Sequence, residues 1–165
     1  MDIVIEKPSH QHITEIAQIC AAGWRQTVEG RLSKAYQDKN VAYWYNHDKV
    51  RSDIDSGNYS HVALIDSKVV GTIGGAMTGP ERGDVYVLYV DEAYRYQGIG
   101  RRLLGALTDK QIAEGALEQW VSVEKDNWHG IPFYKARGFV LQGEQMTEVA
   151  SGETQVSLKY RRDVG

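Results

Sequence analysis

The alternation of hydrophobic and polar positions predicts that the chain mixes strands and helices. Residues 2–6 alternate weakly, which indicates a short first strand. An apolar stripe with helical spacing follows, made of Ile13, Ile16, Ala17 and Cys20. This stripe predicts a helix that begins at the N-cap Ser9, stops near Gly23 and buries Cys20.

The next segment, 24–57, is rich in aromatic residues and has a weaker period. A second helix is predicted near 38–55. Two runs of β-forming residues, roughly 59–66 and 69–77, then predict a hairpin that turns at Asp66-Ser67-Lys68.

The second half of the chain predicts alternating strands and helices. In order, it predicts a strand over 84–90, a helix over about 98–114 that Gly115 ends, a strand over 120–124, a short helix that contains Phe133 and Tyr134 and closes at Arg137-Gly138, and strands over about 139–147 and 153–160. This order implies a mixed sheet with helices on its faces.

The composition narrows the class of protein. At 165 residues, with 42% apolar and 25% charged, the chain is expected to form one soluble globular domain. The net charge of −3 weighs against nucleic acid as a partner. No apolar run is long enough to cross a membrane, and the start of the chain lacks the features of a secretion signal. The single cysteine fits a reducing compartment, so a cytoplasmic location is expected.

The most informative motif joins a strand, a glycine turn and a helix. The β-forming run 85–90 leads into Arg95-Tyr96-Gln97-Gly98-Ile99-Gly100, and a helix-like segment follows from Arg101. The first N–H groups of a helix have no partner within it, and the helix dipole adds positive potential there. Glycines let the backbone approach a bulky phosphate. The motif therefore predicts a phosphorylated ligand at the start of this helix.

Two phosphate-binding designs do not fit this motif. A P-loop needs Gly-Lys-Ser/Thr after its glycines, whereas Gly100 is followed by Arg101-Arg102. The dinucleotide-binding fingerprint needs a third glycine three residues after the second, and that position is Leu103. It would also follow the first strand of a βαβ unit, whereas this motif lies in the middle of the chain. The third design is a site for acyl-CoA.

Three segments carry a resemblance to a known family. Arg95-x-x-Gly98-x-Gly100 resembles the Arg/Gln-x-x-Gly-x-Gly/Ala signature of the GNAT superfamily of acyl-CoA-dependent N-acetyltransferases. Asn127, Phe133-Tyr134 and Gly138-Phe139 resemble the Asn-x5-Phe-Tyr-x3-Gly-Phe segment of that family. Trp24-Arg25-Gln26-Thr27 resembles a Trp-Arg-x-Thr segment of one bacterial branch, some members of which acetylate polyamines.

Three positions depart from the family pattern. Gly130 stands where alanine is common, Pro132 interrupts the first turn of the last helix, and Val28 replaces a frequent tyrosine. Proline is tolerated in a first turn because the N–H groups there have no helical partner. The resemblance implies a single α/β (α+β) N-acetyltransferase domain over 1–165 with the GNAT fold, a mixed six- to seven-stranded sheet with about four helices on its faces.

The resemblance also implies how acetyl-CoA, the acetyl donor, is bound. Backbone N–H groups of residues 96–101 would hold the diphosphate, helped by the charge of Arg95, Arg101 or Arg102. An N–H in Leu88–Val90 would polarise the thioester carbonyl, and Asn127 would bind the pantetheine arm or cap the last helix. The expected cofactor-binding residues are Leu88, Tyr89, Val90, Arg95, Tyr96, Gln97, Gly98, Ile99, Gly100, Arg101 and Asn127.

Tyr134 corresponds to the family's general acid, which protonates the departing thiolate. A tyrosine with an ordinary pKa of about 10 stays protonated at neutral pH, so it is a ready donor, although it could instead pack the last helix on the sheet. The base that takes the proton of the acceptor amine stays open between Asp84, Glu81, Glu124, Tyr86 and water, because none has decisive spacing.

The acceptor site is expected from residues 24–45 and from the loop near 145–153. Four aromatic residues could form a wall over a cation there: Trp24, Tyr36, Tyr43 and Trp44. The five histidines show no metal-ligand spacing, so no metal site is expected.

The leading hypothesis is transfer of an acetyl group from acetyl-CoA to a primary amine of a small molecule, polyamine or amino-acid-like, by direct attack on the thioester. The alternatives are acetylation of a protein N-terminus or lysine, which needs a peptide groove, and a non-catalytic acyl-CoA-sensing module. No nucleic-acid or membrane partner is expected, and the superfamily makes a homodimer plausible.

Overall fold

The computed structural model describes residues 2–148 and 152–165 and contains a seven-stranded sheet. Its strands are β1 (Val4–Glu6), β2 (Tyr59–Ile65), β3 (Lys68–Met77), β4 (Arg82–Val90), β5 (Glu118–Glu124), β6 (Val140–Glu148) and β7 (Thr154–Asp163). They lie in the order β1-β2-β3-β4-β5-β7-β6. Within the described ranges only the β4–β5 pair is parallel, so the predicted mixed sheet is confirmed.

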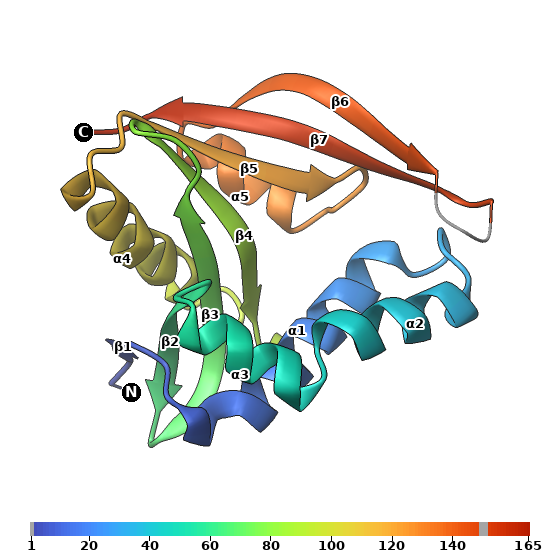
Figure 1. Ribbon diagram of the computed structural model, residues 1–165, viewed down its shortest axis with the longest axis horizontal. Coiled ribbons are helices and arrows are strands. Elements are labelled where there is room, and N and C mark those ends of the chain that lie inside the picture. The colour runs from blue at the N-terminus through green and yellow to red at the C-terminus, as the bar shows by residue number, and fades with distance from the viewer. Residues whose placement is uncertain (1, 149–151) are drawn as a thin grey trace.

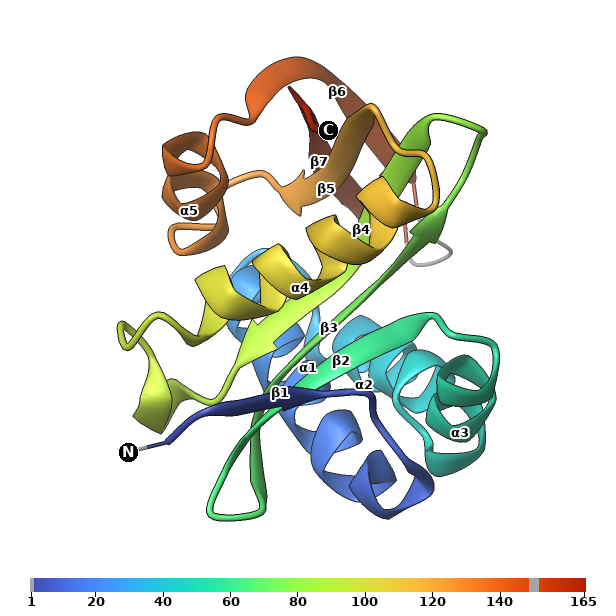
Figure 2. The same ribbon diagram turned by 90° about the vertical axis from the view of Figure 1, so that its left-hand side faces the viewer.

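Helices cover both faces of the sheet (Figure 2). They are α1 (Ile13–Val28), α2 (Lys34–Trp44), α3 (His47–Asp55), α4 (Ile99–Ala113) and α5 (Gly130–Ala136), with 3₁₀ turns at η1 (His10–His12) and η2 (Glu92–Tyr94). The helices α1 and α3 pack around one core cluster that includes Ile16 and Cys20. The helix α4 packs around another that includes Leu103 and Tyr134. No residue of α2 is buried.

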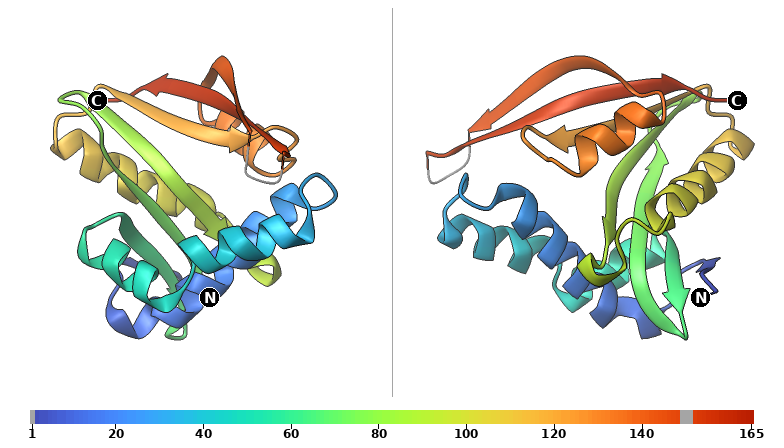
Figure 3. Two further views of the ribbon diagram at one scale, coloured as in Figure 1. Left: turned by 45° about the vertical axis from the view of Figure 1, so that its right-hand side comes forward. Right: turned by 180° about the vertical axis from the view of Figure 1, so that it is seen from behind.

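The parallel strands β4 and β5 pair at one end only. Their register runs from Arg82–Glu118 to Val85–Val121. Beyond Val85 the two strands diverge, so the sheet opens into a V (Figure 1). The strands β5, β7 and β6 form one long, curved arm of this V, while β4 to β1 form the other (Figure 3).

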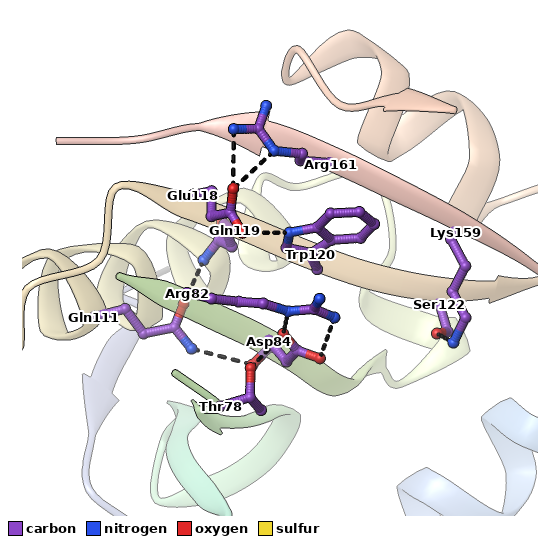
Figure 4. A network of polar contacts seen from close by, with 10 residues as sticks. All are labelled: Thr78, Arg82, Asp84, Gln111, Glu118, Gln119, Trp120, Ser122, Lys159 and Arg161. Atoms are coloured by element: carbon purple, nitrogen blue, oxygen red, sulfur yellow. Dashed lines mark hydrogen bonds and ion pairs between the residues drawn. The ribbon is translucent and has the colours of Figure 1, made fainter. Parts of the chain in front are cut away.

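A polar network holds the closed end of the V (Figure 4). The Asp84 carboxylate accepts hydrogen bonds from Arg82 Nε at 2.8 Å and from the Thr78 hydroxyl at 3.0 Å. Gln111 of α4 donates to the backbone carbonyl of Asp84 at 3.0 Å and accepts from Gln119 Nε2 of β5 at 3.0 Å. Both glutamines are buried with these partners satisfied, so the network fixes how β4 and β5 meet.

The predicted stop at Gly23 is wrong, because α1 continues through it to Val28. The glycine serves packing instead. A β carbon at Gly23 would stand 2.3 Å from ring atom Cδ1 of Tyr89, so only glycine lets α1 lie this close to β4.

The predicted second helix is two helices, α2 and α3, which raises the number of α-helices from the expected four to five among the described residues. The side chain of Asn46 accepts a hydrogen bond from the Lys49 N–H at 2.8 Å and so caps the start of α3. This cap starts a new helix at His47 and so interrupts the single helix that was predicted.

The predicted hairpin of β2 and β3 is confirmed, with left-handed φ values of 51° at Asp66 and 65° at Ser67 in its two-residue turn. Gly115 follows α4 with a φ of 103°, as expected of a residue that ends a helix.

Candidate active site

The open end of the V holds a cavity of about 1710 Å³. β4 and β5 form its walls, the starts of α4 and α5 close one side, and α1 and α2 close the other. Most of the residues predicted for the site line it: Leu88, Tyr89, Val90, Arg95, Tyr96, Gly98, Ile99, Gly100, Arg101, Asn127 and Tyr134. Gln97 is the exception.

The turn into α4 presents a row of backbone N–H groups. Within residues 2–148 and 152–165, no acceptor bonds to the N–H groups of residues 96–101, and the next N–H, that of Arg102, donates to the Gly98 carbonyl at 3.1 Å. Tyr96 and Gly98 have left-handed φ values of 64° and 81°. Such backbone is typical of concave anion-binding loops, and here it precedes a helix N-terminus. The arrangement fits a diphosphate.

Gly100 also brings α4 and α5 together. A β carbon at this position would stand 3.3 Å from ring atom Cε1 of Phe133, which is a tight contact. The two helices that frame the row of N–H groups are therefore packed directly against each other.

The arginines of the motif differ in their contacts. Arg95 Nη2 donates to Gln26 Oε1 of α1 at 2.5 Å, and Gln26 in turn donates to Glu92 at 3.2 Å. Arg101 is exposed and lines the cavity, and Arg102 is exposed outside it. Of the three, Arg101 is the arginine best placed for a phosphate.

Beyond Val85, the edge of β4 that faces the cavity pairs with no other strand of the described residues. On its other edge β4 pairs with β3, and the N–H of Asp91 donates to the Val70 carbonyl at 2.8 Å. Because successive N–H groups of a strand alternate in direction, those of Leu88 and Val90 point the opposite way, toward the cavity. The register with β5 ends at Val85, so β5 offers them no partner. Two donors are available where the sequence prediction left a choice of three.

Tyr134 lines the cavity although its side chain is only 6% exposed. Its ring packs edge-to-face against Phe133 and Phe139, with centroid separations of 5.2 and 5.3 Å. Burial raises the pKa of Tyr134 well above its ordinary value near 10. The phenol is therefore protonated throughout the neutral range.

Asn127 caps α5. Its Oδ1 accepts from the N–H groups of Gly130 at 2.9 Å and His129 at 3.2 Å. A β carbon at Gly130 would stand 2.5 Å from Asn127 Nδ2, which explains why this chain has glycine where alanine is common. Pro132 lies in the first turn of α5, where its missing N–H costs no hydrogen bond.

The side chains considered as a base occupy different places. Asp84 belongs to the network at the closed end of the V and does not line the cavity, and neither does Glu81. Tyr86 lines the cavity but is 51% exposed. Glu124, the last residue of β5, also lines it, and burial raises the pKa of its carboxyl above the ordinary value. Of the three carboxylates considered as a base, Glu124 is the one that lines the cavity.

Two successive side-chain hydrogen bonds connect Glu124 to α2. The Gln155 side-chain amide of β7 donates to the Glu124 carboxylate, and the Tyr36 hydroxyl of α2 donates to Gln155 Oε1 at 3.2 Å. Sequence reasoning did not single out Gln155, because its partners lie 31 and 119 positions away and leave no local pattern.

Two further bridges connect α1 and α2 with the other arm of the V. Glu153 accepts from the Ser33 N–H at 2.7 Å and from the Ser33 hydroxyl at 2.6 Å. Arg31 pairs with Asp126 at 3.1 Å. A peptide acceptor would need a groove between the α1–α2 region and the β6–β7 hairpin, and the Ser33–Glu153 bridge joins these two regions. Of the predicted acceptor loop 145–153, residues 149–151 lie outside the described residues.

Three of the four aromatic residues considered for a wall over a cation reach the cavity. Trp24, Tyr36 and Trp44 line the cavity, and the rings of Trp24 and Tyr36 meet edge-to-face at 6.3 Å. Tyr43 is 61% exposed and does not line it, so its predicted place in the wall is wrong. Tyr45 lines the cavity instead. Neighbouring residues in a helical segment point in different directions. A cluster of aromatic residues in the sequence therefore does not show which ring faces the cavity.

Two kinds of feature are absent from residues 2–148 and 152–165. No group of three or more His, Cys, Asp or Glu side chains is arranged to hold a metal ion. No helix among them is both long and apolar enough to cross a membrane.

Comparisons with known proteins agree with this geometry. Residues 16–139 match the Acetyltransferase (GNAT) family. The chain is 24% identical over 147 residues to spermidine N(1)-acetyltransferase of Thermoplasma acidophilum, a match that covers 86% of this chain and 91% of that protein.

Solved structures share the fold. One is the PaiA N-acetyltransferase of Thermoplasma acidophilum in complex with coenzyme A, with a TM-score of 0.78, 22% identity, and 97% of this chain and 100% of that chain covered. Another is YncA of Salmonella typhimurium with acetyl-CoA, with a TM-score of 0.69, 15% identity, and 99% of this chain and 94% of that chain covered.

Proposed function

Because the chain belongs to the Acetyltransferase (GNAT) family and is an acetyl-CoA-dependent N-acetyltransferase, we propose that its acceptor is a primary amine of a small cationic molecule, of the polyamine class. The observation that carries this proposal is Glu124, a carboxylate in the cavity whose side chain bonds to a neutral amide. The relative named as a spermidine acetyltransferase supports the same class of acceptor.

The donor fits the side of the cavity between α4 and α5. In our proposal the unpaired N–H groups of residues 96–101 hold the diphosphate, and Arg101 adds a positive charge beside it. The pantetheine arm then runs along the open edge of β4, where the N–H groups of Leu88 and Val90 receive the thioester carbonyl. Asn127 Nδ2, which faces Gly130, is available to the arm as a donor.

The acceptor amine has to lose a proton before it can attack. An alkylammonium with a pKa near 10 is neutral in only about one molecule in 10³ at pH 7. Glu124, whose raised pKa makes it a stronger base than an exposed carboxylate, takes that proton. The amine nitrogen then forms a bond to the carbonyl carbon of the thioester, and the carbon–sulfur bond breaks.

The departing thiolate takes a proton from Tyr134. Its phenol is buried against two aromatic rings and protonated at neutral pH, which suits a group that donates once per turnover. The nitrogen of the new amide gives up its second proton, which restores the phenol of Tyr134, and Glu124 passes the first proton to solvent. The products are the acetylated amine and coenzyme A. The amine and the thioester also gain from being held together, so the base and the acid supply only part of the rate.

The bridges between the arms favour a small acceptor over a folded protein. The Ser33–Glu153 bridge joins the N-cap of α2 to the residue before β7, where an extended peptide would have to pass. The Arg31–Asp126 bridge joins the segment before α2 to the segment after β5. A thin alkylamine reaches Glu124 without breaking them. Acetylation of a protein lysine would require at least one bridge to open.

Steady-state rates with acetyl-CoA and a panel of amines test the proposal. We expect turnover of spermidine and putrescine, and a fall of about 10² in kcat/KM for Glu124→Gln. Glu6→Gln, which removes a charge from an exposed position of β1 that does not line the cavity, is the matched control and should behave as wild type. If acetyl-CoA binds but no amine is turned over, the protein is an acyl-CoA sensor. If only peptides are turned over, the acceptor class is wrong.

A further inference from the structure

Glu124, Gln155 and Tyr36 come from three separate elements and meet in one line of hydrogen bonds. The Gln155 side chain uses both ends of its amide, because Nε2 donates to Glu124 and Oε1 accepts from the Tyr36 hydroxyl. Neither bond belongs to the sheet or to a helix. Both bonds therefore fix side chains that line the cavity and take no part in backbone pairing.

We propose that Gln155 and Tyr36 are positioning residues that keep the Glu124 carboxylate oriented and ready to accept the proton of the acceptor amine. This proposal rests on the proposed role of Glu124 as the base. Gln155 acts on Glu124 directly, and Tyr36 acts through Gln155.

The chemistry of the amide explains why two residues are needed. A glutamine side chain can turn over and exchange its NH₂ and C=O ends with little change in shape. With the C=O end toward Glu124, two acceptors would face each other, and the carboxyl could bond only when protonated. Donation from the Tyr36 hydroxyl to Oε1 favours the other orientation, in which Gln155 accepts from Tyr36 and donates to Glu124 and both hydrogen bonds form without protonation of the carboxylate.

The other groups around Glu124 do not replace this contact. The titratable groups that face it are Tyr36 of α2 and Tyr89 of β4, and the pKa of each is raised by burial and by the charge of Glu124. Both are neutral at physiological pH. The charged groups of the adjacent wall, Arg31 and Asp126, pair with each other at 3.1 Å. The Gln155 amide is thus the donor that sets the state of the carboxylate.

The position of Tyr36 depends on how α2 is docked. α2 buries none of its residues, so apolar packing holds it weakly. Its N-cap Ser33 is held by the Glu153 carboxylate from the β7 side, at the helix end where a negative charge is favourable. This contact places Tyr36, three residues further on, within reach of Gln155.

The pH dependence of kcat/KM tests the proposal. Donation from Gln155 stabilises the charged carboxylate and lowers its pKa, so loss of the bond raises that pKa further. The acid limb of the profile should move to higher pH by about one unit in Gln155→Leu and by a smaller step in Tyr36→Phe.

Tyr43→Phe is the matched control, because it removes a hydroxyl from the same helix at a site outside the cavity. Its profile should coincide with that of wild type. If Tyr36→Phe and Gln155→Leu lower the rate equally at every pH and leave the acid limb in place, the residues are merely structural and the proposal is overturned.

A second measurement does not depend on turnover. The carboxyl of Glu124, followed by NMR in protein with ¹³C-labelled glutamate and assigned with Glu124→Gln, should titrate at higher pH in Gln155→Leu than in wild type. An unchanged titration overturns the positioning role. An upward shift combined with full activity of Glu124→Gln would instead support the contact and refute Glu124 as the base.

Discussion

The substitution Gly100→Glu tests the donor site most directly. Gly100 is the second residue of α4, within the row of unpaired N–H groups. A glutamate there places a carboxylate where the diphosphate of coenzyme A is expected. At a separation of about 5 Å and an effective dielectric constant of about 20, each pair of like charges costs about 3 kcal/mol, which corresponds to roughly a 10²-fold loss of affinity.

The variant is expected to fold. Replacing a helical glycine by glutamate gains about 0.5 kcal/mol in helix propensity, and an acid in the first turn gains about as much from the helix dipole. The new β carbon would lie 3.3 Å from the Phe133 ring, so the ring has to move by only a few tenths of an ångström. Loss of binding can therefore be separated from loss of structure.

Gly105→Glu is the matched control. It adds the same charge to the same helix at an exposed position where a β carbon meets nothing within 4 Å. Calorimetric titration with coenzyme A should give wild-type affinity for Gly105→Glu and at least a 10²-fold higher Kd for Gly100→Glu. Binding by Gly100→Glu within twofold of wild type would refute the assignment of the diphosphate to residues 96–101.

Three further predictions use other parts of the molecule. Tyr134→Phe should lower kcat by about 10² without changing the Kd of coenzyme A, and an unchanged kcat would exclude Tyr134 as the acid. Because burial raises the pKa of this tyrosine, wild type should show no loss of activity from its deprotonation up to pH 9. Gly23→Ala should destabilise the fold by about 1–3 kcal/mol in urea titrations, since its β carbon would meet a ring atom of Tyr89 at 2.3 Å. Gly105→Ala should stabilise the fold by up to about 1 kcal/mol, and equal unfolding midpoints of the two variants would refute the packing argument. Glu153→Gln should raise the kcat/KM of a tripeptide amine relative to spermidine by about tenfold, because it weakens the bond that docks α2. Glu6→Gln, on exposed β1, is the control, and an unchanged ratio in Glu153→Gln would show that the bridge does not select acceptors.

The features that the sequence predicted correctly are those formed by neighbours in the chain. The turn that contains Gly98 adopts a left-handed φ because glycine alone does so without strain, and the orphan N–H groups follow from the start of any helix. The hairpin turn at Asp66 and Ser67 is equally local. Interactions within about six residues leave a pattern that can be read.

The features that the sequence missed are set by contacts between distant segments. Gly23 looked like a helix stop, but Tyr89 makes glycine necessary inside α1. Asp84 and Glu124 could not be ranked as bases from the sequence, because only the fold shows that one is tied to Arg82 and the other faces the cavity. The Gln155 contacts also bridge separate strands and helices.

The strand β4 borders both the donor side and the acceptor side of the proposed site, so both sides depend on how β4 pairs. The first part of β4 is paired on both sides and is held to β5 by the buried amides of Gln111 and Gln119. In the proposed mechanism the second part leaves one edge free, since a fully paired β4 would have no donor for a thioester carbonyl and no space for an acceptor. Unpaired N–H groups inside a protein are costly unless water or a ligand satisfies them. The closed end of the V therefore has to be rigid enough to keep the open end apart, and substitutions at Gln111 or Gln119 should reduce catalysis although neither residue lines the cavity.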